Sequence, residues 1–227
     1  MNDPYYINFQ DFSLARLQDN FQSGEVLPAR QILKQDLGRR FQILSSLGLH
    51  SLDDLISALK TKQKVEKFSR QSGLPLEYLV ILRREVRSYI PKPVYLGEIP
   101  GVDGNAIEKL ASVGIKHSKH FFERGQSNKM REKLALDTGI SKKILLELAK
   151  LSDLARVRGI GATYTRLCYE TGADTLEKMA GWDPEDLRQA ALQVNQEQGI
   201  TKVVPPLKDF KQYVELAGDL PKQMEFE

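Results

Sequence analysis

A Gly-Ile-Gly turn between two apolar stretches is the part of the sequence best suited to binding chemistry. Gly159 and Gly161 flank Ile160, and apolar residues recur at helical spacing on both sides. This pattern predicts two short helices joined by a tight hairpin, because glycine adopts such a turn without steric cost. The backbone N–H groups of residues 159–162 would open the second helix, where unpaired donors and the helix dipole favour an anion such as phosphate.

The same stretch resembles the helix-hairpin-helix motif, in which apolar anchors surround a Gly-apolar-Gly core. The matching positions are Leu154, Val157, Gly159, Ile160, Gly161, Tyr164 and Leu167. The resemblance implies contact with a nucleic-acid backbone, which carries no base information. The residues that it nominates for this contact are Arg158, Gly159, Ile160, Gly161, Ala162, Thr163 and Arg166, together with Gly101, Val102 and Gly104 of a related upstream hairpin. The alternative is a turn that only packs two helices, with Ile160 in the core and Phe210 or Tyr213 covering it.

A histidine pair invites a metal interpretation. His117 and His120 are three residues apart and share a helical face, but only Glu123 lies nearby as a further ligand, and lysines flank the pair. These features disfavour a cation, so we expect no metal.

No pattern typical of catalysis is present. The sequence has no glycine-rich phosphate loop ending in Lys-Ser/Thr, no Gly-x-Ser-x-Gly elbow and no cysteine-histidine pairing. The acidic pairs Asp53/Asp54 and Glu185/Asp186 stand at predicted helix starts, where carboxylates act as caps. We therefore expect no enzyme and no cofactor.

Length and composition indicate a globular protein. The chain has 227 residues, 41% of them hydrophobic, which is enough for one large or two small domains. The apolar runs are interrupted by charges, and residues 1–6 lack the layout of a signal peptide. We expect a cytoplasmic protein without membrane contact. The single cysteine, Cys168, excludes a disulfide within the monomer and is expected in the core.

Charge is distributed unevenly along the chain. The net charge is +3, but residues 170–227 hold 12 acidic and 6 basic side chains, which leaves +9 on residues 1–169. Each basic cluster either meets phosphates or forms a solvated helix face. The clusters are Lys60, Lys62, Lys64, Lys67 and Arg70; Arg83, Arg84 and Arg87; and Lys116, Lys119, Arg124, Lys129, Arg131 and Lys133.

Glycines recur at nearly fixed intervals. Gly48, Gly114 and Gly172 are each expected to end a helix, and a second glycine follows each of them, at positions 73, 139 and 199. Buried positions recur with them, at Leu55, Phe121 and Met179 and at Leu44, Leu110 and Cys168. This periodicity predicts three tandem copies of one helical unit and an all-α fold without a sheet.

The second copy shows the expected order of elements. Residues 96–100 form a short first helix, residues 101–104 the hairpin, and residues 105–113, 117–124, 127–138 and 141–150 the following helices. Residues 13–21 and 29–37 are expected as amphipathic capping helices. Residues 207–217 are expected as a closing helix with Phe210, Tyr213 and Val214 on one side, and residues 221–227 as a loose tail.

Residues 95–217 resemble the bacterial family known as domain of unknown function 4332. The resemblance rests on Leu134–Ser141, Ser152–Gly161, Gly172–Leu176, Trp182–Leu187 and Val194-Asn195. The family is similar to helix-hairpin-helix and sterile-alpha-motif-like folds. We expect capping helices and a degenerate first repeat in residues 1–92, a second repeat in residues 93–150, and a third repeat with its capping helix in residues 151–227.

The first two copies depart from the hairpin pattern. The second has Asp103 where the third has Gly161, and a carboxylate there would repel phosphate. The first has Gln35–Gly38 and has lost the pattern. The sequence thus predicts a non-catalytic, sequence-nonspecific nucleic-acid-binding module, with DNA preferred over RNA as the partner. The alternative is a protein-interaction or oligomerisation scaffold that binds a protein partner instead, and the sequence leaves the oligomeric state open.

Overall fold

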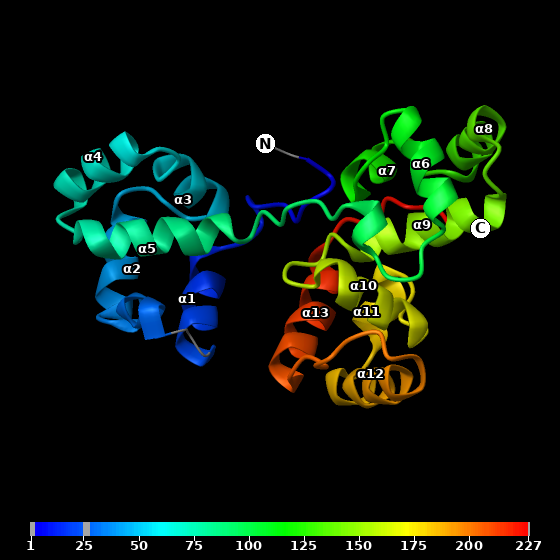
Figure 1. Cartoon of the computed structure of the whole chain (residues 1–227). Helices are drawn as coiled ribbons and strands as arrows, with labels where there is room; N and C mark the ends of the chain where they lie inside the picture. The colour runs from blue at the N-terminus through cyan, green and yellow to red at the C-terminus, as the bar shows by residue number, and fades with distance from the viewer. Residues whose placement is uncertain (1–2, 25–27, 227) are drawn as a thin grey trace. The chain divides into compact units, whose positions relative to one another are not determined.

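The computed structural model describes residues 3–24 and 28–226 and confirms the all-α prediction. The described residues contain no strand, only two isolated β-bridges, Ser13 with Ser51 and Tyr95 with His117. The helices are α1 Leu14–Ser23, η1 Pro28–Lys34, α2 Leu37–Ser46, α3 Leu52–Ala58, α4 Lys62–Ser72, α5 Leu76–Arg87, η2 Leu96–Glu98, α6 Gly104–Ser112, α7 Ser118–Arg124, α8 Asn128–Thr138, α9 Lys142–Leu154, α10 Gly161–Glu170, α11 Leu176–Gly181, α12 Pro184–Gln198 and α13 Leu207–Asp219 (Figure 1).

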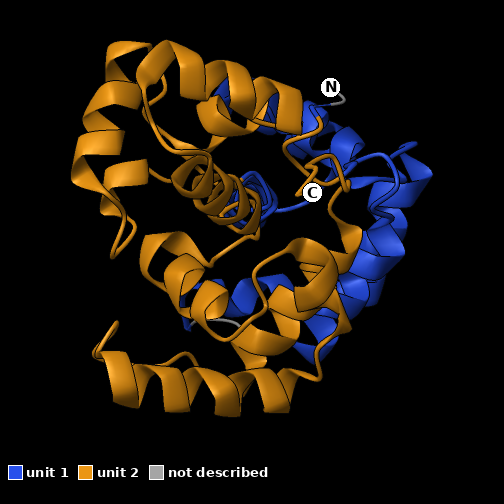
Figure 2. Cartoon of the chain, turned by 90° about the vertical axis from the view of Figure 1, so that its right-hand side faces the viewer, with its two compact units in different colours: residues 1–3, 8–90 blue, residues 4–7, 91–227 orange. Residues whose placement is uncertain are grey.

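The chain divides into two compact units (Figure 2). Unit 1 comprises residues 1–3 and 8–90, and unit 2 comprises residues 4–7 and 91–227. Residues 4–7 therefore belong to unit 2 although they lie between the two segments of unit 1 in the sequence. The division into three repeats stays a prediction.

Unit 1 is built around α5, which packs against α3, α4 and η1. The inner face of α5 buries Tyr78, Leu79, Leu82 and Val86 completely. Burial of this apolar stripe, rather than intrinsic helix propensity, provides most of the stability of such short helices.

One predicted helix in unit 1 is wrong. Residues 29–37 were expected as one amphipathic helix, but η1 is a 3₁₀ segment that ends at Lys34, and α2 begins at Leu37. Asp36 separates them because it adopts the left-handed conformation, with φ of 47°. Aspartate tolerates the left-handed conformation better than most residues. A residue in this conformation interrupts an α-helix, so η1 and α2 are separate elements.

Unit 2 is built around α9, which packs against α7, α8 and α10. Its core includes Leu145, Leu148, Ala149 and Leu151 of α9. At the other end of the unit, α13 packs against α11 and α12, as the predicted closing helix requires. Phe210 and Tyr213 of α13 are buried, and Val214 is half-buried.

The C-terminal segment of unit 2 is not the loose tail that its composition suggested. The carbonyl oxygen of Pro221 accepts a hydrogen bond from Arg156, and the N–H of Glu225 donates to the carbonyl oxygen of Gln126 over 2.9 Å. Met224 and Phe226 pack against the core of the unit. Their apolar side chains hold the segment against unit 2 despite its lack of helix.

All six recurrent glycines end helices, as predicted for the first set of three. Gly48, Gly114 and Gly172 follow α2, α6 and α10 with φ between 81° and 88°. The second set ends α4, α8 and α12, again in the left-handed region, which glycine occupies without a Cβ penalty. All six apolar positions of the predicted period, including Cys168, are fully buried.

Candidate nucleic-acid interface

The predicted hairpin is present between α9 and α10. The apolar anchors Leu154, Val157, Ile160 and Leu167 are at most 1% exposed. Gly159 and Gly161 have φ of 86° and 59°, so both positions lie in the region that favours glycine. These two glycines reverse the chain within six residues while Ile160 inserts into the core.

The amide side of this turn is open. A shallow pocket of about 310 Å³ is lined by Gly159, Ile160, Gly161, Ala162, Thr163, Tyr164 and Thr201. No side chain caps α10, because the residue before it is Ile160. The N–H groups of the first turn of a helix have no partner within the helix. Three of them, at residues 161–163, therefore border the pocket at the positive end of the helix dipole.

The opposite side of the turn is closed by α13. The hydroxyl group of Tyr213 donates to the carbonyl oxygen of Gly159 over 3.3 Å, and its ring lies 3.9 Å from where a Cβ of Gly159 would stand. Burial raises the pKa of Tyr213 above its ordinary value, so the hydroxyl stays a donor. Gly159 and Gly161 nevertheless remain exposed. Tyr213 thus packs against the side of the turn opposite the pocket and does not cover the amides.

Arg166, nominated for phosphate contact, does not lie on the surface. It is 6% exposed, and its guanidinium group pairs with Glu170 at 2.9 Å and with Glu147 at 2.6 Å. Its Nε donates to the carbonyl oxygen of Pro100 over 2.7 Å. Arg166 is therefore not placed for the phosphate contact that was predicted for it, because its guanidinium group is already neutralised and hydrogen-bonded within unit 2. Arg158 is half-buried beside the turn.

The upstream hairpin has a different amide side. Gly101 makes the turn with φ of 75°, and Asp103 is extended rather than left-handed. The Oδ1 atom of Asp103 accepts a 2.9 Å hydrogen bond from the N–H of Ala106 and caps α6. The chain's own carboxylate thus takes the place that an anion would occupy. Gly101 and Gly104 are exposed, and Val102 is half-buried against the core.

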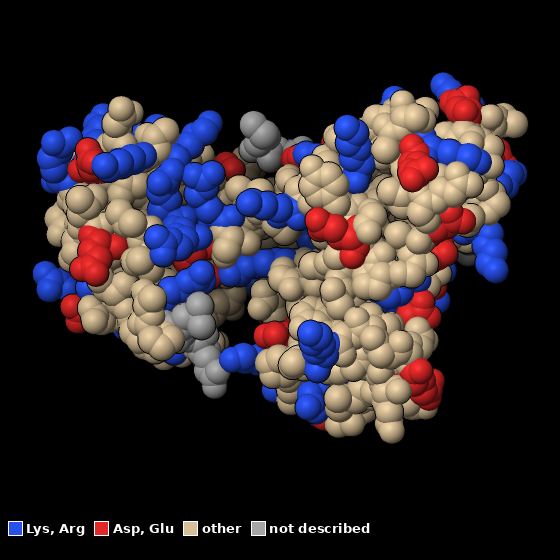
Figure 3. All heavy atoms as spheres, viewed as in Figure 1, with Lys and Arg blue, Asp and Glu red and all other residues tan. Residues whose placement is uncertain are grey.

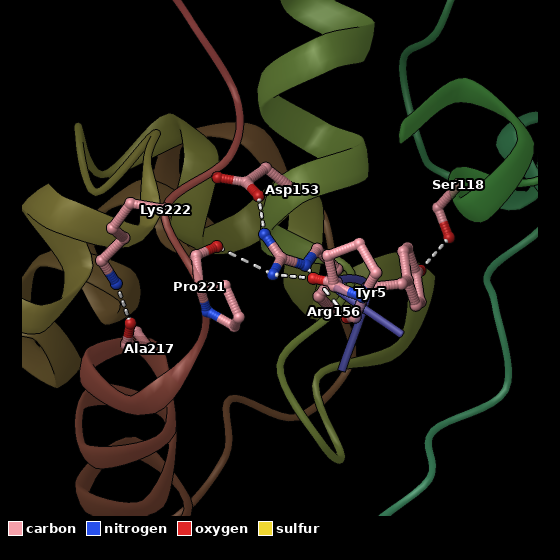
Figure 4. A network of polar contacts seen from close by, with 8 residues as sticks. Tyr5, Ser118, Asp153, Arg156, Ala217, Pro221 and Lys222 are labelled. Atoms are coloured by element: carbon pink, nitrogen blue, oxygen red, sulfur yellow. Dashed lines mark hydrogen bonds and ion pairs between the residues drawn. The ribbon is translucent and has the colours of Figure 1, made fainter. Parts of the chain in front are cut away.

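A buried arginine just before the turn was not foreseen. The guanidinium group of Arg156 pairs with Asp153 and donates to the carbonyl oxygens of Pro4, Tyr5 and Pro221 (Figure 4). Only 1% of Arg156 is exposed. Burial raises the pKa of Asp153, and Arg156 opposes this shift. The i,i+3 spacing of this pair was visible in the sequence, but the three carbonyl partners were not.

The predicted basic clusters have different surroundings. In unit 2, Arg131 is 3% exposed and donates to the carbonyl oxygens of Gly125 and Gln126, and Arg124 donates to that of Val113. Two of the six members of that cluster therefore bind the chain's own carbonyl oxygens, and Lys116, Lys129 and Lys133 are exposed. In unit 1, the basic side chains of α4 and α5 gather on the surface (Figure 3).

The histidine pair is a local structural feature. The rings of His117 and His120 stack with centroids 3.5 Å apart. The Nδ1 atom of His117 accepts from the N–H of His120 and caps α7, and the Nδ1 atom of His120 accepts from the N–H of Lys116. Within residues 3–24 and 28–226, no group of three or more His, Cys, Asp or Glu side chains is arranged for a metal ion. Among these residues, no helix has both the length and the hydropathy needed to cross a bilayer.

The comparisons with known proteins show the family of unit 2. No curated protein and no solved structure matches the chain. A family model described as "Domain of unknown function (DUF4332)" matches residues 100–220, which is more than half of the chain and lies within unit 2. The matched range begins at the upstream hairpin, includes the hairpin of residues 158–163 and ends after α13. The chain belongs to the DUF4332 family.

Proposed function

We propose that this chain is a non-catalytic, cytoplasmic module that binds the backbone of nucleic acid, preferentially duplex DNA, through the hairpin of residues 158–163. The observation that carries the proposal is the open amide pocket at the start of α10, with an uncapped helix end and two exposed glycines. A phosphate oxygen in this pocket accepts from backbone N–H groups and meets the positive end of the helix dipole. Such contacts position a duplex without reading its bases.

The residues around the pocket set the strength of the contact. Lys202 is exposed and directly follows Thr201, which lines the pocket, and Arg158 precedes the turn. Arg166 does not take part, since its charge is paired internally. One hairpin with few neighbouring cations gives a weak contact that depends on salt, because each neutralised phosphate releases counterions.

We further propose that the hairpin belongs to the last of three tandem repeats. Supporting this, three equivalent positions cap helices: Ser51 caps α3, His117 caps α7 and Thr175 caps α11, each through a side chain that accepts the N–H three residues later. Because the second and third hairpins are then copies of one unit, the upstream hairpin keeps the same turn although the carboxylate of Asp103 occupies its anion position.

Gly161→Asp tests the hairpin directly. The substitution gives the third hairpin the residue type that the second one has and adds a carboxylate at a residue that lines the pocket. The matched control is Gly172→Asp, because Gly172 is also exposed, has φ of 88° and has open space around it. Both variants add one negative charge and similar backbone strain.

The measurement is fluorescence anisotropy with a duplex of about 30 base pairs, at about 50 and 200 mM salt. We expect Gly161→Asp to weaken binding about tenfold and Gly172→Asp to weaken it less than about twofold. The same duplex made of RNA tests the preference for DNA. Equal affinities of the two variants, or no binding of the unaltered chain at the lower salt, would overturn the proposal. In the latter case, an oligomer or a co-purifying protein that survives nuclease treatment would favour the scaffold alternative.

A further inference from the structure

Unit 1 carries an exposed basic surface on α4, on α5 and at Lys60, two residues before α4. Residues 60–87 contain eight basic and three acidic side chains. Seven of the basic side chains are exposed, and we call them the basic face: Lys60, Lys62, Lys64, Lys67, Arg70, Arg84 and Arg87. Figure 3 shows Lys and Arg side chains gathered over these helices.

The basic face is not neutralised by its own unit. Glu85, the acidic residue nearest to the arginines of α5 in sequence, is buried and pairs with Arg30 of η1. In the part of the chain that the structure describes, no ion pair involves any of the seven exposed cations. Exposed like charges repel one another, and a bound polyanion would relieve this repulsion.

The two helices present these charges on a rigid support. Val65 of α4 and Leu79 and Leu82 of α5 are buried at their shared interior. Arg83 donates to the carbonyl oxygen of Lys60 over 3.1 Å and fixes the turn before α4. The helices are about 16 and 18 Å long. Duplex DNA carries one negative charge per roughly 1.7 Å of its axis, so a surface of this length spans several phosphates.

The buried faces of α4 and α5 argue against a membrane as the occupant. A helix that lies in a bilayer interface inserts an apolar face among the lipids. Most of the apolar face of α5 is already used, since Tyr78, Leu79, Leu82 and Val86 are fully buried in unit 1. Leu76 and Val80 of the same helix remain exposed, at 47% and 42%. Two apolar side chains beside seven cations favour contact through charge, which suits the accessible and highly charged backbone of nucleic acid.

We propose that the basic face of unit 1 is a second nucleic-acid backbone contact, separate from the hairpin in unit 2. This inference rests on the proposed nucleic-acid function but not on the hairpin. It lies outside the residues that the family model matches, so it is a property of the part of the chain before Pro100. With two contacts tethered in one chain, binding at one raises the effective concentration of nucleic acid at the other.

The test neutralises three members of the basic face in the full chain, as Lys67→Gln, Arg84→Gln and Arg87→Gln together. The control variant carries Lys129→Gln, Lys143→Gln and Lys211→Gln, three exposed lysines of unit 2, and has the same net charge. The probe is a duplex of about 30 base pairs titrated at several salt concentrations between about 50 and 200 mM.

We expect the basic-face variant to bind about tenfold more weakly at about 100 mM salt, with the slope of log affinity against log salt reduced by about 2 to 3. The control should lose less than about twofold. Equal losses in the two variants would overturn the inference, because net charge alone would then explain them. Binding to vesicles of phosphatidylcholine and phosphatidylserine that is lost in the basic-face variant, without duplex binding by the unaltered chain, would also overturn it.

Gly161→Asp separates this inference from the proposed function. If that variant binds normally while the basic-face variant does not, the hairpin proposal fails and the basic face stands. If only Gly161→Asp weakens binding, the basic face is a solvated surface and this inference fails.

Discussion

Arg166 of α10 donates a 2.7 Å hydrogen bond from its Nε to the carbonyl oxygen of Pro100, 66 residues earlier in the chain. The guanidinium group also lies over Gly101, with its Cζ 3.8 Å from where a Cβ of that glycine would stand. One side chain therefore fixes the upstream hairpin to α10, while Glu147 and Glu170 neutralise its charge.

We expect Arg166→Ala to destabilise unit 2 by about 2 to 3 kcal/mol. The loss is below that of a fully buried ion pair, because Glu147 and Glu170 keep access to water once the arginine is gone. Trp182 is the only tryptophan and lies in unit 2, so its fluorescence during urea unfolding reports on this unit. Lys142→Ala removes an exposed ion pair and should leave the unfolding midpoint unchanged. Equal midpoints for both variants would show that Arg166 is not a structural link.

The second prediction concerns Arg156, which joins residues from both ends of the chain within unit 2. We expect Arg156→Ala to cost about 3 to 5 kcal/mol, because it leaves Asp153 buried without its partner. Arg156→Lys keeps the charge but lacks the planar group that reaches three carbonyl oxygens, so it should recover only part of the loss.

Hydrogen exchange provides the specific readout for Arg156. We expect the amides of residues 5–7 to exchange faster in Arg156→Ala under conditions in which α9 stays protected, because Arg156 holds this segment through the carbonyl oxygens of Pro4 and Tyr5. Unchanged exchange of residues 5–7 would contradict the role of Arg156 as the anchor of this segment.

The sequence was sufficient for those features that depend on neighbouring residues. The left-handed glycines that follow α6 and α10, the cap of Ser51 and the Gly-Ile-Gly turn are decided by residues within one helical turn of one another. The burial of Ile160 followed from the same local period.

The sequence was insufficient where distant residues meet. In the sequence, nothing distinguishes Arg156 and Arg166 from surface arginines. Their nearby acidic partners were visible, since Asp153 lies three residues before Arg156 and Glu170 four residues after Arg166. Their carbonyl partners lie 65 to 152 residues away, at Pro100, Pro221, Tyr5 and Pro4, and no local pattern encodes them. The packing of residues 221–226 was missed for the same reason, because a short apolar segment is ordered only by the surface that receives it.

The third prediction is a pH dependence centred on His117. Burial, and then the neighbouring His120, lower the pKa of His117 in the folded protein below its ordinary value of 6.5. Glu123 opposes the shift and Lys119 adds to it. Because the unfolded chain binds the proton more readily, this contribution to stability is present above about pH 6.5 and is lost as the pH falls toward the folded pKa.

We expect His117→Thr to reduce the loss of stability between about pH 7 and pH 5. Threonine keeps an oxygen that can cap α7, as Thr175 caps α11, but it does not titrate. The measurement is the urea midpoint of unit 2 at each pH. An unchanged pH slope in His117→Thr would show that protonation of this cap does not destabilise the unit.

The last prediction compares two glycines of unit 2, one next to a buried ring and one with open space around it. A Cβ at Gly125 would stand 2.6 Å from Cε1 and 3.0 Å from Cδ1 of Phe121, whose ring is fully buried. Gly125→Ala should therefore destabilise the unit by about 1 to 3 kcal/mol through overpacking. Gly218 lies in α13 with nothing within 4 Å, and it is exposed. Gly218→Ala should stabilise the unit by about 0.5 to 1 kcal/mol, because alanine loses less backbone entropy in a helix. Urea unfolding of both variants followed at Trp182 checks the signs, and a stabilising Gly125→Ala would contradict the tight contact between residue 125 and the Phe121 ring.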